Sequence, residues 1–271
     1  MKKGLSILVT ILLMAVMSSC NTGMIPVGGE SEGRFTSYSE SMYYPLYMLS
    51  NWWGWGEFTQ ASYLSDGTVV VVQPGTAWSI DKGSTAERMV MDNEVRTIVL
   101  AGVGSSSRGT AALAKLVANE LNEPVAGIVT GYGDISTSSE GVEGYFVGRS
   151  NNEDGTYYDN DASYKLALLL YNGARPTRII GHSKGAMDAA NALYLLDQVG
   201  CAYSYSQTTF TTFGMGVFVP SGLAGHVQYI GTADTLGSIN TVNESPMTYV
   251  QDKGHSLNPV MSMHIPIDGK L

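Results

Sequence analysis

Strand-like and helix-like segments alternate through the middle of this chain, and that alternation limits the fold more than any other feature. A β-branched run at 67–72 ends at the turn residues Pro74 and Gly75. Further strand-like runs lie at 95–101, 124–129, 177–181, 208–219, 226–232 and 247–250, and helical spacing lies at 109–121, 162–173 and 184–199. This order predicts the α/β class: a mostly parallel sheet with helices on both faces.

A serine lies between one predicted strand and the helix that follows it. The segment Gly181-His182-Ser183-Lys184-Gly185 has the pattern G-x-S-x-G. On a sharp strand-to-helix turn this pattern presents the serine hydroxyl clear of the backbone, and both glycines are needed where side chains would collide with neighbouring elements. Ser183 is therefore the candidate nucleophile. The alternative is a glycine-rich turn at which the serine caps the helix.

The position of a general base can be narrowed among the histidines. A hydrolase of this topology needs the order serine, acid, histidine along the chain. His255 follows the last predicted strand, whereas His264 lies in an apolar stretch and is the alternative. His182 lies inside the turn, and we expect its side chain to point elsewhere. His226 precedes the expected acid.

The expected acid is Asp234, which comes just after the predicted strand 226–232. A buried carboxylate there would hold the imidazole tautomer of His255 and stabilise its charged form. Asp252 is the rival, but it is three residues from His255 and is expected to be solvated.

Two backbone amides are expected to stabilise a developing oxyanion. One belongs to Lys184, directly after the serine, and the other to Val103, with Gly104 as the next choice, in the loop after strand 95–101. The same loop begins like a dinucleotide-binding turn. However, Ser107 stands where a third glycine belongs, and no acid follows strand 124–129, which argues against nucleotide binding.

The first twenty residues have the pattern of an export signal. Lys2 and Lys3 precede an apolar run at 5–17, and small residues lead to Cys20. The ending Met-Ser-Ser-Cys resembles the lipobox of bacterial lipoproteins, which implies a signal peptide at 1–19 and a lipid on Cys20. We expect a flexible tether at 20–33, a single domain at 34–271, and a lipid-anchored protein of the bacterial cell envelope, at the outer membrane because Asn21 is not aspartate.

Composition excludes several classes of partner. The formal charge is −9 and basic runs are lacking, which argues against nucleic acid and against charge-driven binding to anionic lipid. With only Cys20 and Cys201, the chain is not a disulfide scaffold, and Cys201 is expected to be a small buried hydrophobe. No histidine pair at ligand spacing and no cysteine cluster occurs, so we expect neither a metal nor an organic cofactor.

Together the G-x-S-x-G segment, the loop 101–104, Asp234 and His255 resemble the α/β-hydrolase superfamily. The segment 181–185 is similar to the G-H-S-x-G turn of class 3-type lipases. This resemblance implies a serine ester hydrolase, of lipase or esterase type, acting on an ester or lipid through an acyl-enzyme. Ala101-Gly102 replaces the usual His-Gly of the oxyanion loop, and Lys184 replaces the usual leucine or glutamine. The alternative is a non-catalytic surface lipoprotein that uses the scaffold for binding or assembly.

Two further segments have alternative interpretations. The aromatic segment 43–58, with Trp52, Trp53 and Trp55, is either an interfacial surface or acyl pocket, or a packing cluster. The polar, glycine-rich segment 131–161 is either a lid over the serine or a solvated loop.

Overall fold

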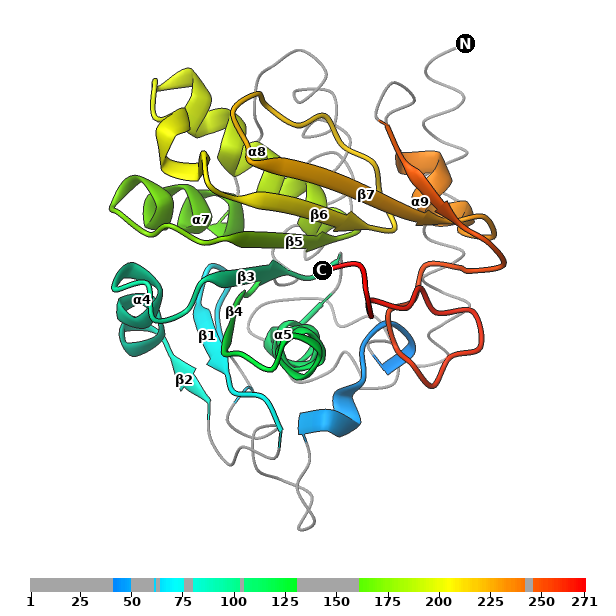
Figure 1. The fold of residues 1–271 in the computed structure, drawn as a ribbon. Coiled ribbons are helices and arrows are strands. Elements are labelled where there is room, and N and C mark those ends of the chain that lie inside the picture. Colours follow the sequence, from blue (N-terminus) through cyan, green and yellow to red (C-terminus); the bar gives the residue numbers. More distant parts are fainter. Residues whose placement is uncertain are drawn as a thin grey trace, which may run out of the picture.

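The computed structural model describes residues 41–49, 61, 64–75, 80–102, 105–130, 161–241 and 246–271 (Figure 1). Its strands are β1 (Val69–Val72), β2 (Asp81–Lys82), β3 (Thr97–Leu100), β4 (Val125–Ile128), β5 (Arg178–His182), β6 (Thr209–Phe213), β7 (Gly225–Gly231) and β8 (Thr248–Val250). Its helices are η1 (Leu46–Leu49), α4 (Ser84–Met91), α5 (Ser107–Leu121), α7 (Asp161–Tyr171), α8 (Lys184–Gln198), η2 (Ala202–Tyr205) and α9 (Thr235–Asn240).

The strands form one eight-stranded sheet in the order β2-β1-β4-β3-β5-β6-β7-β8. Strand β1 runs antiparallel to β2 and β4, and every other pairing is parallel. The predicted α/β class with a mostly parallel sheet is therefore confirmed. Because β3, β5, β6, β7 and β8 run in the same direction, the loops that follow them gather at one edge of the sheet.

Helices cover both faces of the sheet, as predicted. In β1, Val69 and Val71 pack into the core that contains the buried residues of α4, α7 and α8, whereas Val70 and Val72 pack into the core that contains those of α5 and η1. This alternation follows from the two-residue period of a strand. The C-terminal segment joins the second core through Leu257, Ile265 and Ile267. Among the described residues, no helix has the length and apolarity needed to cross a membrane.

The structure differs from the sequence prediction in one strand that is shorter than expected and in three short elements that were not expected. The predicted strand 208–219 ends at Phe213, because the chain turns at Gly214, whose φ is 71°. Strand β2 and helices α4 and α9 were not predicted, because each is short and α4 buries only Ala86 and Val90. The tether 20–33 and nearly all of the predicted insertion at 131–161 lie outside the described residues.

Candidate active site

Ser183 lies on the turn between β5 and α8. Its backbone has φ 54° and ψ −125°, a conformation that residues other than glycine seldom adopt. Although Ser183 occupies the N-cap position of α8, its side chain makes no capping hydrogen bond. A serine that serves only as a helix cap would accept a hydrogen bond from an amide of the first helical turn, and Ser183 does not. Capping therefore does not explain the strained backbone of this turn.

The two glycines beside Ser183 have no room for a side chain. A Cβ atom on Gly181 would overlap the backbone of Ala186, and one on Gly185 would overlap the carbonyl oxygens of Leu100 and Ala101. Backbone atoms in a packed sheet and helix cannot move away as a flexible side chain can. The predicted steric reason for both glycines is confirmed.

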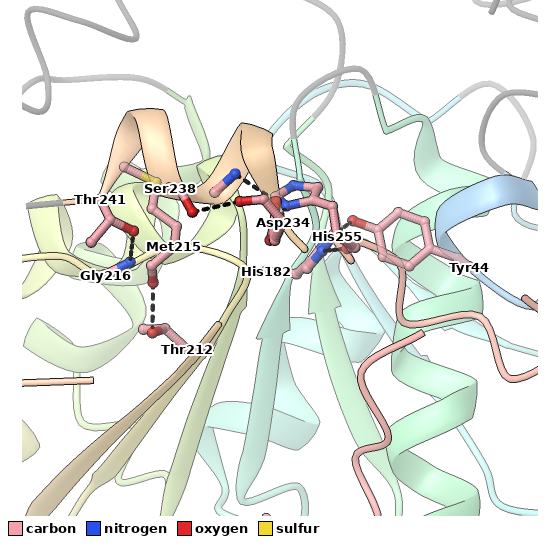
Figure 2. Close-up of polar contacts among 10 residues, drawn as sticks. Tyr44, His182, Thr212, Met215, Gly216, Asp234, Ser238, Thr241 and His255 are labelled. Carbon is pink, nitrogen blue, oxygen red and sulfur yellow. Dashed lines mark hydrogen bonds and ion pairs between the residues drawn. The ribbon is translucent and has the colours of Figure 1, made fainter. Parts of the chain in front are cut away.

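Asp234 and His255, which are 21 residues apart, meet at the carboxyl edge of the sheet (Figure 2). The Nδ1 atom of His255 lies 2.7 Å from Oδ2 of Asp234, whose side chain is fully buried. The second oxygen, Oδ1, accepts a hydrogen bond of 2.6 Å from the amide of Gly237 at the start of α9. The carboxylate orients the imidazole through Nδ1, so Nε2 is the nitrogen available for proton transfer.

Backbone contacts link Ser183 to the region of His255. The amide of Ser183 donates to the carbonyl oxygen of Phe213 over 2.9 Å. The next residue, Gly214, lies so close to the His255 imidazole that a Cβ atom there would be 2.9 Å from Nδ1 and from Cε1. No hydrogen bond joins the Ser183 hydroxyl to His255 in the part of the chain that the structure describes. In enzymes without substrate, such bonds are often long and tighten when substrate binds.

The rival residues lie elsewhere. His264 Nδ1 contacts the carbonyl oxygen of Met261 at 2.7 Å, three residues earlier in its own loop. Asp252 is exposed, as expected, and its amide donates to the Thr232 hydroxyl over 2.9 Å. His226 is exposed on β7. The structure pairs Asp234 with His255, whereas the alternative, His264, contacts Met261.

His182 is where the sequence interpretation missed a contact. Its side chain was expected to point elsewhere, but its ring centroid lies 4.9 Å from that of His255, and its Nε2 lies 2.8 Å from the His255 carbonyl oxygen. Its Nδ1 lies 2.6 Å from the Tyr44 hydroxyl. Burial lowers the pKa of His182 from its ordinary 6.5 to about 3, the nearby His255 adds to the decrease, and the hydrogen bond to the His255 carbonyl opposes it. His182 is thus neutral at physiological pH.

The expected oxyanion donors are only partly described. Val103 and Gly104 lie outside the described residues. The preceding amide, that of Gly102, donates to the Tyr44 hydroxyl over 2.6 Å and so points at that group. Gly102 itself lies beside Ser183, since a Cβ atom on Gly102 would be 3.1 Å from Cβ of Ser183. Lys184 begins α8, where helix amides lack partners within the helix.

The side chain of Lys184, the residue after Ser183, is buried. Its Nζ lies 2.8 Å from Oδ2 of Asp188, one helical turn further along α8, and both side chains are almost fully buried. Removing one partner of such a pair would take the opposite charge away from a buried group and would be destabilising. We assign this side chain a structural role; the expected catalytic contribution of Lys184 is through its backbone amide.

Other predicted features have mixed outcomes. Trp52, Trp53, Trp55 and Cys20 lie outside the described residues. Cys201 packs against the core that contains α8, as expected of a small hydrophobic residue, but it is only half-buried. Within the described ranges, no group of three or more histidine, cysteine or acidic residues is arranged to hold a metal ion.

Comparisons with known proteins add little to this geometry. No protein-family model matches the chain, and no curated protein matches it. Among solved structures, the crystal structure of esterase PE8 is similar at 14% identity and a TM-score of 0.35, over 60% of this chain and 86% of that chain. Similarity at this level does not bear on activity. The sheet, the strained serine turn and the chain order of Ser183, Asp234 and His255 are those of the α/β-hydrolase fold.

Proposed function

We propose that this protein is a serine ester hydrolase of the lipase or esterase type, with Ser183 as nucleophile, His255 as general base and Asp234 as the acid that orients it. The observation that carries the proposal is the strained backbone of Ser183, φ 54°, without a capping bond, at the same sheet edge as the 2.7 Å Asp234–His255 pair. Strain at a buried turn persists only where the surrounding structure enforces it, and it clusters at active sites.

The proposed reaction has two steps. The Ser183 hydroxyl attacks the ester carbonyl while Nε2 of His255 takes its proton, and the same nitrogen then protonates the departing alcohol as the acyl-enzyme forms. Water, deprotonated by His255, next attacks the acyl group, and the acid product leaves as Ser183 recovers its proton. Throughout, Asp234 holds Nδ1–H of His255, and its bond from the Gly237 amide fixes the carboxylate.

The oxyanion is proposed to rest on the amides of Lys184 and Val103. In support of this choice, the Gly102 amide already donates to the Tyr44 hydroxyl and so is not available for a substrate oxygen. Each such donor contributes about 10²- to 10³-fold to the rate in comparable enzymes.

A fluorophosphonate probe tests the proposal, because it labels only an activated serine. We expect the wild-type protein to be labelled and Ser183→Ala to be unlabelled, with an unchanged circular dichroism spectrum and an esterase rate lower by about 10⁴-fold or more. Unlabelled wild-type protein that hydrolyses no p-nitrophenyl ester would contradict the proposal and favour a non-catalytic binding or assembly module. A series of p-nitrophenyl esters from acetyl to palmitoyl would identify the acyl chain.

We further propose that the protein is tethered to a membrane of the bacterial cell envelope by a lipid on Cys20, with the outer membrane as its site. The support is the export-signal pattern and the Met-Ser-Ser-Cys ending in the sequence. Mass spectrometry of the N-terminal peptide is the test. A diacylglyceryl-modified Cys20 at a new N-terminus is expected, and an unmodified Cys20 or cleavage elsewhere would contradict it.

A further inference from the structure

A chain of hydrogen bonds runs behind the candidate site and joins three segments that are distant in sequence. The Gly102 amide donates to the Tyr44 hydroxyl over 2.6 Å. That hydroxyl lies 2.6 Å from Nδ1 of His182, and Nε2 of His182 lies 2.8 Å from the carbonyl oxygen of His255 (Figure 2). Tyr44 and His182 are each 1% exposed. The chain therefore connects the oxyanion loop, the serine turn and the base loop in a water-excluded region.

The groups at the two ends of this hydrogen-bonded chain determine which atom donates in each of its bonds. The Gly102 amide can only donate, so the Tyr44 oxygen accepts from it, and the Tyr44 hydroxyl can in turn donate to Nδ1 of His182. A carbonyl oxygen can only accept, so Nε2 of His182 carries the hydrogen that bonds His255. The result is the neutral Nε2–H form of His182, which agrees with its pKa of about 3. A neutral neighbour also avoids repelling the charged imidazole that His255 becomes during the reaction.

The segment that carries Tyr44 is bonded to the base loop as well. The Ser256 hydroxyl donates to the Met42 carbonyl oxygen over 2.6 Å, and the Leu257 amide donates to the Tyr43 carbonyl oxygen over 3.1 Å. The Asn258 side-chain amide donates to the carbonyl oxygen of Ser41. The three residues that follow His255 are thus each bonded to the backbone of residues 41–43.

We propose that Tyr44 and His182 are positioning residues that hold the backbone of His255 and of Gly102 in the geometry needed for hydrolysis. Neither residue touches the reacting atoms; both act through the placement of the base and of the oxyanion loop. The inference rests on the proposed esterase function. A displacement of about 1 Å in a catalytic group can cost about 100-fold in rate, even when the altered residue is remote from the reacting atoms.

The first experiment compares Tyr44→Phe with the matched control Tyr205→Phe. Tyr205 is also fully buried, and its hydroxyl donates to the Ser221 carbonyl oxygen over 3.3 Å, but it precedes β6 at the opposite edge of the sheet. We expect Tyr44→Phe to lower kcat by about 10- to 100-fold with KM changed less than about threefold. Tyr205→Phe should keep the wild-type kcat. A wild-type kcat for Tyr44→Phe, a change confined to KM, or an equal decrease in both variants would overturn the inference.

The second experiment is independent of activity and uses the Ser183→Ala protein. Long-range ¹H–¹⁵N correlation should show His182 as the neutral Nε2–H form, and amide exchange of Gly102 should rise about tenfold when Tyr44→Phe is added. An Nδ1–H form of His182 or unchanged exchange would refute the chain. If wild-type protein hydrolyses no ester while both signatures appear, the proposed function fails and the hydrogen-bonded chain stands.

Discussion

The serine side and the base side of the candidate site are held in place by different kinds of contact. Ser183 sits between Gly181 and Gly185, whose missing side chains allow β3, β5 and α8 to approach closely. His255, in contrast, is held by Asp234, by His182 and by the segment 41–44, through hydrogen bonds that span 21, 73 and more than 200 residues. The first arrangement is steric, whereas the second is made of polar contacts. Substitutions should therefore affect the two sides in different ways.

The largest expected effect distinguishes the base from its rival. His255→Ala should lower kcat by about 10⁴-fold or more, nearly as far as Ser183→Ala, because members of a triad act as a unit. The double variant should be little worse than either single variant. His264→Ala, which loses only a bond to Met261, should keep most of the rate and lower stability slightly. Turnover of p-nitrophenyl acetate by each folded variant is the measurement, and an inactive His264→Ala beside an active His255→Ala would reverse the assignment.

On the serine side, Gly185→Ala should mainly lower the stability of the folded protein. The added Cβ would overlap two carbonyl oxygens of β3 and its extension, so we expect a loss of about 4 kcal/mol or more in the free energy of unfolding. Urea unfolding measures this loss. Gly225→Ala is the matched control, because nothing lies within 4 Å of its Cβ position, and it should cost less than about 1 kcal/mol. Equal losses in the two variants would contradict the steric account.

On the base side, Gly214→Ala should affect catalysis more than stability. Its Cβ would lie 2.9 Å from the His255 ring, so the ring must shift, and we expect kcat to fall by about 100-fold. The backbone strain at φ 71° adds a stability cost of about 1–2 kcal/mol. Gly200→Ala carries the same strain at φ 74° with nothing within 4 Å, and should lose stability alone. Equal rates for both variants would show that His255 tolerates the added methyl group.

The smallest effect comes from His182 and depends on pH. Its folded pKa, about 3, lies below the unfolded value of 6.5, so its contribution to stability is complete above pH 6.5 and is lost as pH falls from 6.5 toward 3. Between pH 7.5 and pH 5 the loss is about 2 kcal/mol. Urea unfolding of wild type and of His182→Gln at both pH values separates this group from others, since the variant should lose about 2 kcal/mol less. Identical losses would mean that His182 is already protonated in the folded protein or is more exposed than described.

The contrast between the two sides also explains what the sequence could predict. The mostly parallel sheet and the serine turn follow from hydrophobic periodicity and from glycine spacing, which are encoded within a few residues of each other. Asp234 and His255 could be chosen by their order after strands β7 and β8, and the structure brings them together. Tyr44 could not be found in this way, because its partner His182 is 138 residues away and one tyrosine among sixteen has no distinguishing pattern.

The failures of prediction within the fold have similar physical causes. Residues 214–219 were predicted to continue a strand, but the positive φ of Gly214 turns the chain toward His255. Glycine adopts positive and negative φ about equally well, so the sequence alone could not predict this turn. Strand β2 has two residues and pairs only with β1, so it leaves no periodic signal. Helix α9 has only six residues. Its N-cap is Asp234, which the sequence analysis interpreted as the catalytic acid and not as a helix cap.

The bond between Ser256 and Met42 spans 214 residues, and this separation has a consequence for biosynthesis. The serine turn can form once β3, β5 and α8 have been made, but the base loop can reach residues 41–44 only after nearly the whole polypeptide has emerged. Contacts of such long range form late, because ordering the intervening loop is entropically costly. A partly synthesised chain therefore contains the Ser183 turn before residues 41–44 can fix the loop of His255, so the proposed hydrolytic site is assembled only when folding is complete.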